Sequence, residues 1–304
     1  MKRQNIFLKS WNLLKDTFLE FNEDNAIKLS ASLSYYTLFA LPPLLIIIIT
    51  ICGFFFGEEA VTGELYGQIN RLVGNDAAIQ IQEAIKNVQL SDSNVFITVF
   101  GVVMLLIGAS GVFAEIQSSI NFIWGLRAKP NKGLKKFIQN RIMSFSMIAS
   151  VGFLMLVSLM LNTVLDLLNS RLKLYFPEST VYLFYVINLV LVLASITLLF
   201  AIIFRTLPDG VIKWKDAFIG ASCTAALFMI GKFAIGFYLG SSTIASVYGA
   251  AGSVIIILVW VYYSAIILYF GAEFTKVYAK SYGGQIVPNE YSVEIKKEIF
   301  EIKE

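Results

Sequence analysis

The chain has 304 residues, of which 57% are hydrophobic and 15% charged, and its net charge is +3. Soluble domains carry about 25% charged residues, so this composition excludes an ordinary soluble domain and indicates an integral membrane protein. The sequence contains no histidine, which excludes His-based zinc sites, histidine general bases and Ser-His-Asp triads. We therefore expect no enzyme, no cofactor and no metal site.

The N-terminal arm, residues 1–28, is basic and predicts an amphipathic helix. Phe7, Trp11, Leu14 and Phe18 recur in it at helical spacing. Such a helix could lie along the membrane surface, where anionic lipid would attract its lysines. It could equally form a cytosolic cap packed under a helix bundle.

Six apolar segments follow, and each is long enough to cross a bilayer core of about 30 Å as a helix. The sequence therefore predicts an all-α, polytopic bundle of six transmembrane helices. Residues 57–94 between the first two segments predict an extracytoplasmic loop with helical pieces. Residues 280–304 predict a charged cytoplasmic tail, helical from Ser292 onward. The expected spans are about 29–56, 95–124, 142–168, 181–204, 217–239 and 251–274.

The distribution of lysine and arginine predicts the orientation of the bundle. The arm, residues 125–141, residues 205–216 and the chain from Lys276 onward carry five, six, three and five of these residues. The loops on the other side carry two, two and none. Cytoplasmic segments are enriched in positive charge, so both termini are expected in the cytoplasm of a bacterial inner-membrane protein.

The first span contains adjacent prolines, Pro42 and Pro43, after a half that is rich in hydroxyl groups and includes Tyr35. Two prolines remove two amide donors and must bend or interrupt the helix. One interpretation is a broken helix lining a polar cavity, to which Tyr35 would contribute. The other is a plain kink with ordinary aromatic packing.

The composition of the last apolar segment, 251–274, indicates that the other spans are organised around it. Its Trp260, Tyr262 and Tyr263 lie mid-span instead of at an interface. Small residues at 249–252 precede it and would let a neighbouring backbone approach. This segment is therefore predicted to pack against several helices.

Lys232 is the most unusual residue of the fifth span, because an ammonium near mid-membrane costs about 2.5–3.5 kcal/mol. It is either a ligand-binding or ion-pathway residue, or a lysine that snorkels to the interface. We predict that it faces the bundle interior, where Asp166 is the acidic partner at compatible depth.

Glu115, Glu273 and Arg205 are expected at similar depth near the cytoplasmic edge, because each lies at the inner end of a span. They could form a charged inner gate. The alternative is a structural cluster of ion pairs, with Glu273 paired to Lys276 at i, i+3.

Four segments make the sequence similar to a known family: LSYYTLFALPPLL (33–45), GVFAEIQSSINFIW (111–124), RTLPD (205–209) and the long run 248–279. Together they resemble the bacterial YihY/virulence factor BrkB family. The resemblance implies a multipass inner-membrane protein, with members linked to resistance to host killing, to envelope lipid homeostasis and to transport. It brings no catalytic or binding residues. The family's older label, ribonuclease BN, conflicts with the lack of histidine ligands and of a soluble RNA-binding domain.

Two functions remain from this reading. The first is a transporter-like protein that handles envelope lipids or solutes, with membrane lipids and a lipid or small molecule as partners. The second is a non-transporting scaffold or assembly partner for envelope complexes. A transporter needs a polar cavity near the midplane, whereas a scaffold needs only packed small residues and a docking surface. A nucleic-acid partner is not expected.

Overall fold

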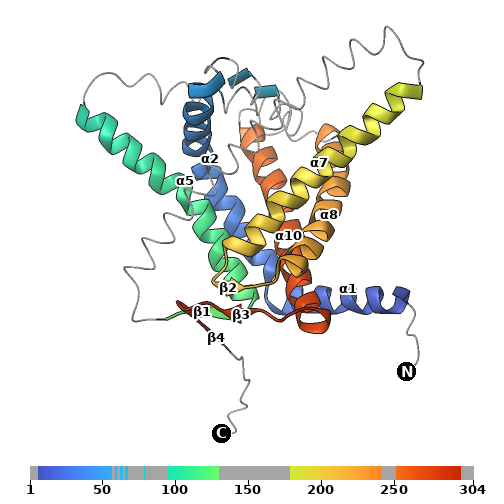
Figure 1. The fold of residues 1–304 in the computed structure, drawn as a ribbon. Coiled ribbons are helices and arrows are strands. Elements are labelled where there is room, and N and C mark those ends of the chain that lie inside the picture. The colour runs from blue at the N-terminus through green and yellow to red at the C-terminus, as the bar shows by residue number, and fades with distance from the viewer. Residues whose placement is uncertain are drawn as a thin grey trace.

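The computed structural model describes residues 6–56, 95–129, 179–241 and 251–295, with a few isolated positions between 57 and 94. This part of the chain is mostly helical, as predicted (Figure 1). The expected span 142–168 and most of the expected loop 57–94 lie outside the described residues. The helices are α1 (Ile6–Glu23), α2 (Ala26–Phe56), α5 (Val95–Ile123), α7 (Ser179–Thr206), α8 (Trp214–Ser241) and α10 (Ala251–Tyr282).

Three of the described helices are long and apolar enough to cross a membrane. The qualifying stretches are Leu189–Thr206 in α7, Trp214–Ile235 in α8 and Val254–Tyr282 in α10. They correspond to three of the six expected spans. The chain is thus an α-helical membrane protein.

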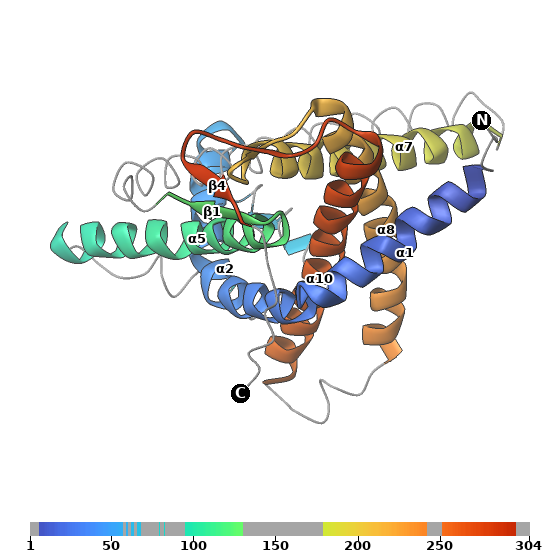
Figure 2. The same ribbon diagram turned by 90° about the horizontal axis from the view of Figure 1, so that it is seen from below.

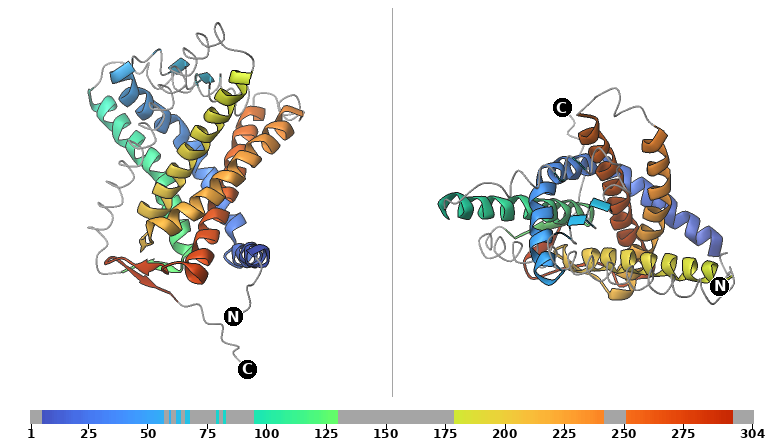
Figure 3. Two further views of the ribbon diagram at one scale, coloured as in Figure 1. Left: turned by 45° about the vertical axis from the view of Figure 1, so that its right-hand side comes forward. Right: turned by 90° about the horizontal axis from the view of Figure 1, so that it is seen from above.

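The long helices converge at the end of the molecule where α1 lies and spread apart toward the other end (Figures 1 and 3). α10 runs through the middle and contacts α1, α2, α5 and α8, which confirms the prediction that this segment packs against several helices. The buried core gathers at the convergent end, where Ile120, Phe204, Ala221 and Tyr269 are fully buried.

α8 and α10 run antiparallel and approach closely through paired small residues. A Cβ at Gly220 of α8 would collide with Thr275 of α10, and a Cβ at Gly271 of α10 would collide with Thr224 of α8. Both threonine hydroxyls donate to a carbonyl of their own helix, at 2.7 and 2.8 Å. The contact therefore leaves neither hydroxyl unsatisfied. Small residues that admit a neighbouring backbone are a common basis of membrane helix packing.

α1 lies across the ends of the long helices (Figures 1 and 2). Its buried face carries Thr17 and Phe21, which pack toward α10, whereas Trp11 and Phe18 are about 60% exposed. A helix that caps a bundle would bury its large aromatic residues. Of the two interpretations of the arm, the membrane-surface helix fits this exposure.

α2 is helical without interruption through Pro42 and Pro43. Its axis changes direction along its length, as the view from below shows (Figure 2). The broken-helix interpretation is therefore wrong, and the kinked helix is correct. Proline removes a donor and crowds the preceding turn, which bends a helix that its neighbours hold in place. Here those neighbours are α5 and α10.

Two small antiparallel sheets were not expected in the predicted all-α fold. β1 (Leu126–Ala128) pairs with β4 (Ser292–Glu294), and β2 (Gly210–Val211) pairs with β3 (Val287–Pro288). The prediction of a helical tail from Ser292 is therefore wrong at its first three residues, and the chain beyond 295 lies outside the described part. The residues after α10 bond to the loops that follow α5 and α7, which satisfies backbone groups of both segments.

Side chains and turns fix this tail against the bundle. Asp216, buried in the first turn of α8, accepts a hydrogen bond from the Gly284 amide at 2.9 Å. Gly125 ends α5 with φ +66°, a conformation that glycine adopts without strain, and its carbonyl accepts from the Ile295 amide at 2.7 Å. The described part of the tail, up to residue 295, thus packs with the folded core.

We expect Gly271→Ala to lower the unfolding temperature of the purified protein, because the added methyl group collides with Thr224 and overpacking costs about 1–3 kcal/mol. The matched control is Gly111→Ala in α5, where a Cβ meets nothing within 4 Å. Alanine favours a helix over glycine by about 1 kcal/mol, so the control should be neutral or stabilising. Equal effects of the two substitutions on thermal unfolding in detergent would contradict the close α8–α10 contact.

Candidate functional site

Four charged side chains meet where α1 crosses α10. The ammonium of Lys276 lies 2.7 Å from Glu20 Oε2, 3.0 Å from Asp24 Oδ2 and 3.2 Å from Glu273 Oε2. We call these four residues the Lys276 cluster. Glu273 is fully buried and Asp24 nearly so. One cation therefore neutralises part of the charge of three carboxylates.

Helical spacing produces this arrangement from two elements. Glu20 lies in the last turn of α1 and Asp24 directly follows that helix, four residues further on, whereas Glu273 and Lys276 are three residues apart on α10. Burial of a lone carboxylate costs several kcal/mol, and a hydrogen-bonded cation offsets that cost. The sequence prediction of a Glu273–Lys276 pair is confirmed. The contribution of α1 was not foreseen.

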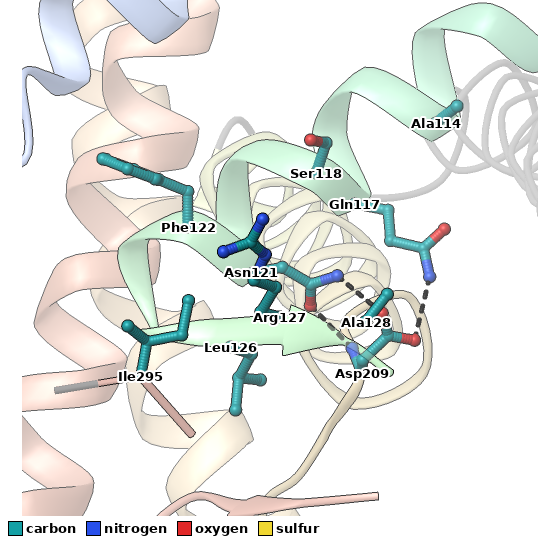
Figure 4. A pocket seen from close by; sticks show the side chains of 10 residues that line it. All are labelled: Ala114, Gln117, Ser118, Asn121, Phe122, Leu126, Arg127, Ala128, Asp209 and Ile295. Carbon is teal, nitrogen blue, oxygen red and sulfur yellow. Dashed lines mark hydrogen bonds between the residues drawn. The ribbon is translucent and has the colours of Figure 1, made fainter. Parts of the chain in front are cut away.

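A second polar cluster joins α5 to the loop after α7 (Figure 4). Asp209, which is buried, accepts from Asn121 Nδ2 at 2.8 Å and from Gln117 Nε2 at 3.3 Å. The Asp209 amide donates in return to Asn121 Oδ1 at 2.7 Å, and its carbonyl accepts from Ser292 at 2.7 Å. We call Asp209, Gln117, Asn121 and Ser292 the Asp209 cluster.

Two pockets open beside these clusters. The first, of about 530 Å³, is lined by Gln117, Asn121 and Asp209, with Arg127 extending from β1 alongside α5 (Figure 4). The second, of about 520 Å³, is lined by residues of α1, α10, the end of α5 and the tail. Its charged residues are Glu20, Glu23, Asp24, Lys276, Lys280 and Glu294. The Lys276 cluster therefore contributes to the wall of this second pocket.

The structure gives the three expected gate residues different partners. Glu115 accepts a hydrogen bond of 2.6 Å from Ser32 of α2. Arg205 lies over the ring of Trp214, 5.8 Å from its centroid. Glu273 pairs with Lys276. Among the described residues, no hydrogen bond or ion pair joins these three side chains to one another, so the alternative of structural contacts at helix ends describes this region better than a single gate.

Lys232 is exposed, which contradicts the prediction that it is enclosed in the bundle interior. Phe233 and Phe237, on the same stretch of α8, are also exposed. The physical reason is the length of α8, which begins at Trp214 and places Lys232 about 27 Å along its axis at 1.5 Å per residue. That distance is close to the full thickness of the bilayer core, so the ammonium can reach the far interface. Its expected partner Asp166 lies outside the described residues.

Tyr35 is 60% exposed on α2 and contacts the ring of Phe39 at 5.0 Å between centroids. It belongs to an exposed aromatic row and lines none of the pockets described above. Pro42 and Pro43 are helical, and their side chains lie outside the described part. Neither proline therefore has a demonstrated place in a cavity.

Sequence reasoning missed Glu20, Asp24 and Asp209. A signal existed for each, because two acids four residues apart on a helix present one charged stripe, and Asp209 ends the RTLPD segment. Gln117 and Asn121 interrupt an apolar pattern one turn apart, which marks a polar stripe on α5. None of these sequence patterns predicts which helix or loop the polar stripe will contact.

The chemistry of the two clusters is that of charge neutralisation and hydrogen bonding. The described residues contain no group of three or more His, Cys, Asp or Glu side chains arranged to hold a metal ion. A buried ionisable group inside a membrane helix is costly, and it often marks a pathway for an ion or substrate. Glu273 and its cation are therefore the candidate site.

We expect Lys276→Met to destabilise the protein by about 3–5 kcal/mol, because Glu273 and Asp24 would lose the cation that compensates their burial. Lys280→Met is the matched control, since Lys280 is exposed one turn further along α10 and should change stability by less than about 0.5 kcal/mol. Adding Glu273→Met to Lys276→Met should restore part of the loss. Thermal unfolding of the purified variants measures all three, and a Lys276 variant as stable as the Lys280 variant would refute the cluster's structural role.

Comparison of the sequence with known proteins identifies the family of this chain. The family model of virulence factor BrkB matches residues 17–294, and no solved structure gives a significant match. A UPF0761 membrane protein of Teredinibacter turnerae is 29% identical over 275 residues, covering 90% of this chain and 61% of that protein. Another, of Saccharophagus degradans, is 26% identical over 265 residues, covering 86% and 58%. The chain thus spans about three-fifths of the length of these relatives. With the family model matching nearly all of the described helices, the chain belongs to the virulence factor BrkB family of membrane proteins.

Proposed function

We propose that this protein is a six-span, transporter-like protein of the bacterial inner membrane that handles a lipid or polar solute of the envelope. The observation that carries the proposal is the buried carboxylate of Glu273 inside a membrane-spanning helix, next to a lysine that lines a pocket of about 520 Å³. A scaffold built only from packed small residues has no need of such a group.

The second pocket would serve as the entrance on the side of α1. Lys276 lines this pocket and also bonds to Glu273 behind it, so the ion pair separates the pocket from the helix interior. Movement of the Lys276 ammonium between Glu273 and the carboxylates of Glu20 and Asp24 would change the charge that faces a solute. The solute would be recognised by the mixed acidic and basic lining of the pocket.

The orientation proposed for the bundle places α1 and the tail in the cytoplasm. In the described ranges, every lysine and arginine apart from Lys232 belongs to α1, its junction with α2, the strands, the helix ends beside them or the last turns of α10. These elements lie at one end of the molecule (Figure 1). Positive charge collects on the cytoplasmic side of membrane proteins, which supports this orientation.

Labelling of single cysteines tests the orientation. In a variant with Cys52 and Cys223 replaced by Ala, a cysteine at residue 63 should react with a membrane-impermeant maleimide in intact spheroplasts. A cysteine at residue 129 should react only after the membrane is permeabilised. Reaction at 129 in intact spheroplasts would overturn the orientation, because residue 129 would then face the outside of the cell.

Flux in proteoliposomes tests the transport proposal. We expect the wild-type protein to accelerate the movement of a fluorescent phospholipid or of a small polar solute across the bilayer. Glu273→Gln should reduce this flux by about tenfold, equivalent to about 1.4 kcal/mol in a barrier, while Glu20 and Asp24 still neutralise Lys276.

Lys280→Gln is the control, because Lys280 lines the same pocket without belonging to the cluster. Transport would be rejected, and the scaffold favoured, if vesicles with folded wild-type protein showed the same flux as protein-free vesicles for both classes of probe.

A further inference from the structure

The corner between α1 and α2 carries a third pocket, of about 320 Å³. α1 and α2 meet beside α10 (Figure 2). The turn depends on Asn25, which has φ +52° and whose carbonyl accepts from the amides of Lys28 and Leu29 at 2.9 and 3.2 Å. The polar residues in the wall are Asn22, Asn25 and Lys28. Its other residues are Phe21, Ile27, Ala31 and Tyr262.

Two exposed apolar rows meet at this pocket. On α1, Phe18 follows Trp11 by seven residues and Asn22 follows Phe18 by four, so the row runs along one face into the corner. On α2, the row Ile27, Ala31, Tyr35 and Phe39 leaves the corner with a repeat of four residues, and all four are exposed. Exposed apolar rows on a membrane protein are covered by lipid.

The length of the α2 row matches one leaflet. From Ile27 to Phe39 the rise is about 18 Å at 1.5 Å per residue, against about 15 Å for half of the hydrocarbon core. The surface-lying α1 sets the level of the headgroups, because its aromatic residues are of the kind that collect at the interface. The polar wall of the pocket therefore lies at the depth of a lipid phosphate, with the row beneath it at the depth of an acyl chain.

The charge of the corner also suits a phosphate group. No carboxylate lines the third pocket, although α1 carries acidic residues, because Glu20 and Asp24 bond to Lys276 on another face. No described residue forms a salt bridge with Lys28, so its ammonium is available. The amide groups of Asn22 and Asn25 each donate one hydrogen bond to a backbone carbonyl of α1, and each has a second N–H left to donate.

We propose that the α1–α2 corner is a binding site for an anionic phospholipid of the leaflet in which α1 lies. Lys28, Asn22 and Asn25 hold the phosphate, and one acyl chain lies along Ile27, Ala31 and Tyr35. This proposal rests on the membrane-surface position of α1 and deepens the proposed function by naming a lipid class. Binding at this corner does not require transport, so the two can fail separately.

Native mass spectrometry of the full chain in detergent, titrated with phosphatidylglycerol or with phosphatidylcholine, tests the site. The wild-type protein should retain more phosphatidylglycerol than phosphatidylcholine. Lys28→Glu should lower phosphatidylglycerol binding by at least about fivefold, the effect expected for one basic residue near an anionic lipid surface. Lys9→Glu is the matched control, since it makes the same charge change at an exposed position on α1 outside the pocket.

Ile27→Trp is the second variant, because it fills the apolar part of the pocket without changing charge, and it should lower the binding of both lipids. Equal losses for Lys28→Glu and Lys9→Glu, or no preference for phosphatidylglycerol in the wild type, would overturn the site. Loss of lipid binding in Lys28→Glu with flux in proteoliposomes unchanged would separate the corner from transport. Intact binding without any flux would reject transport and leave the corner standing.

Discussion

The burial of Glu273 is the constraint on which the convergent end of the molecule depends. An ionised carboxylate that is fully buried in a membrane helix is stabilised by a cation beside it, and Lys276 supplies that cation one turn away. The ammonium of Lys276 in turn pairs with two further carboxylates, Glu20 of α1 and Asp24 directly after it. The ion pair inside α10 therefore also decides where α1 lies, and with it the level at which α1 meets the membrane surface.

Close packing makes the same end of the bundle rigid. The Gly–Thr contacts at Gly220 and Gly271 bring α8 against α10, and Asp216 binds the chain directly after α10. The Asp209 cluster fastens α5 to the loop after α7 and to the tail. Away from this end the long helices spread apart (Figure 1). A fixed base with diverging helices suits a protein whose polar pockets keep their shape at one membrane surface.

Particular residues show how far the sequence could go. The spacing of Trp11 and Phe18 predicted the amphipathic helix, and the i, i+3 spacing of Glu273 and Lys276 predicted their ion pair; both are confirmed. Lys232 was placed wrongly, because the start of α8 at Trp214 moves it toward the far interface. Ser292 was predicted as helical, yet it begins a strand and pairs with Ala128 of β1, 164 residues earlier in the chain. Local pattern carries no information about such a distant partner.

The sequence by itself determined that this is a helical membrane protein, that the apolar segments of the described ranges are helices and where the basic residues of the chain gather. These properties follow from hydropathy, helical periodicity and charge, all of which are local. Only the tertiary structure decided that the C-terminal end of α1 and the turn after it place two carboxylates at Lys276, that Asp209 meets Asn121 and that Gly271 meets Thr224. Each of these contacts joins elements that are far apart in the chain, and their relative position is fixed by side-chain packing, which no single segment encodes.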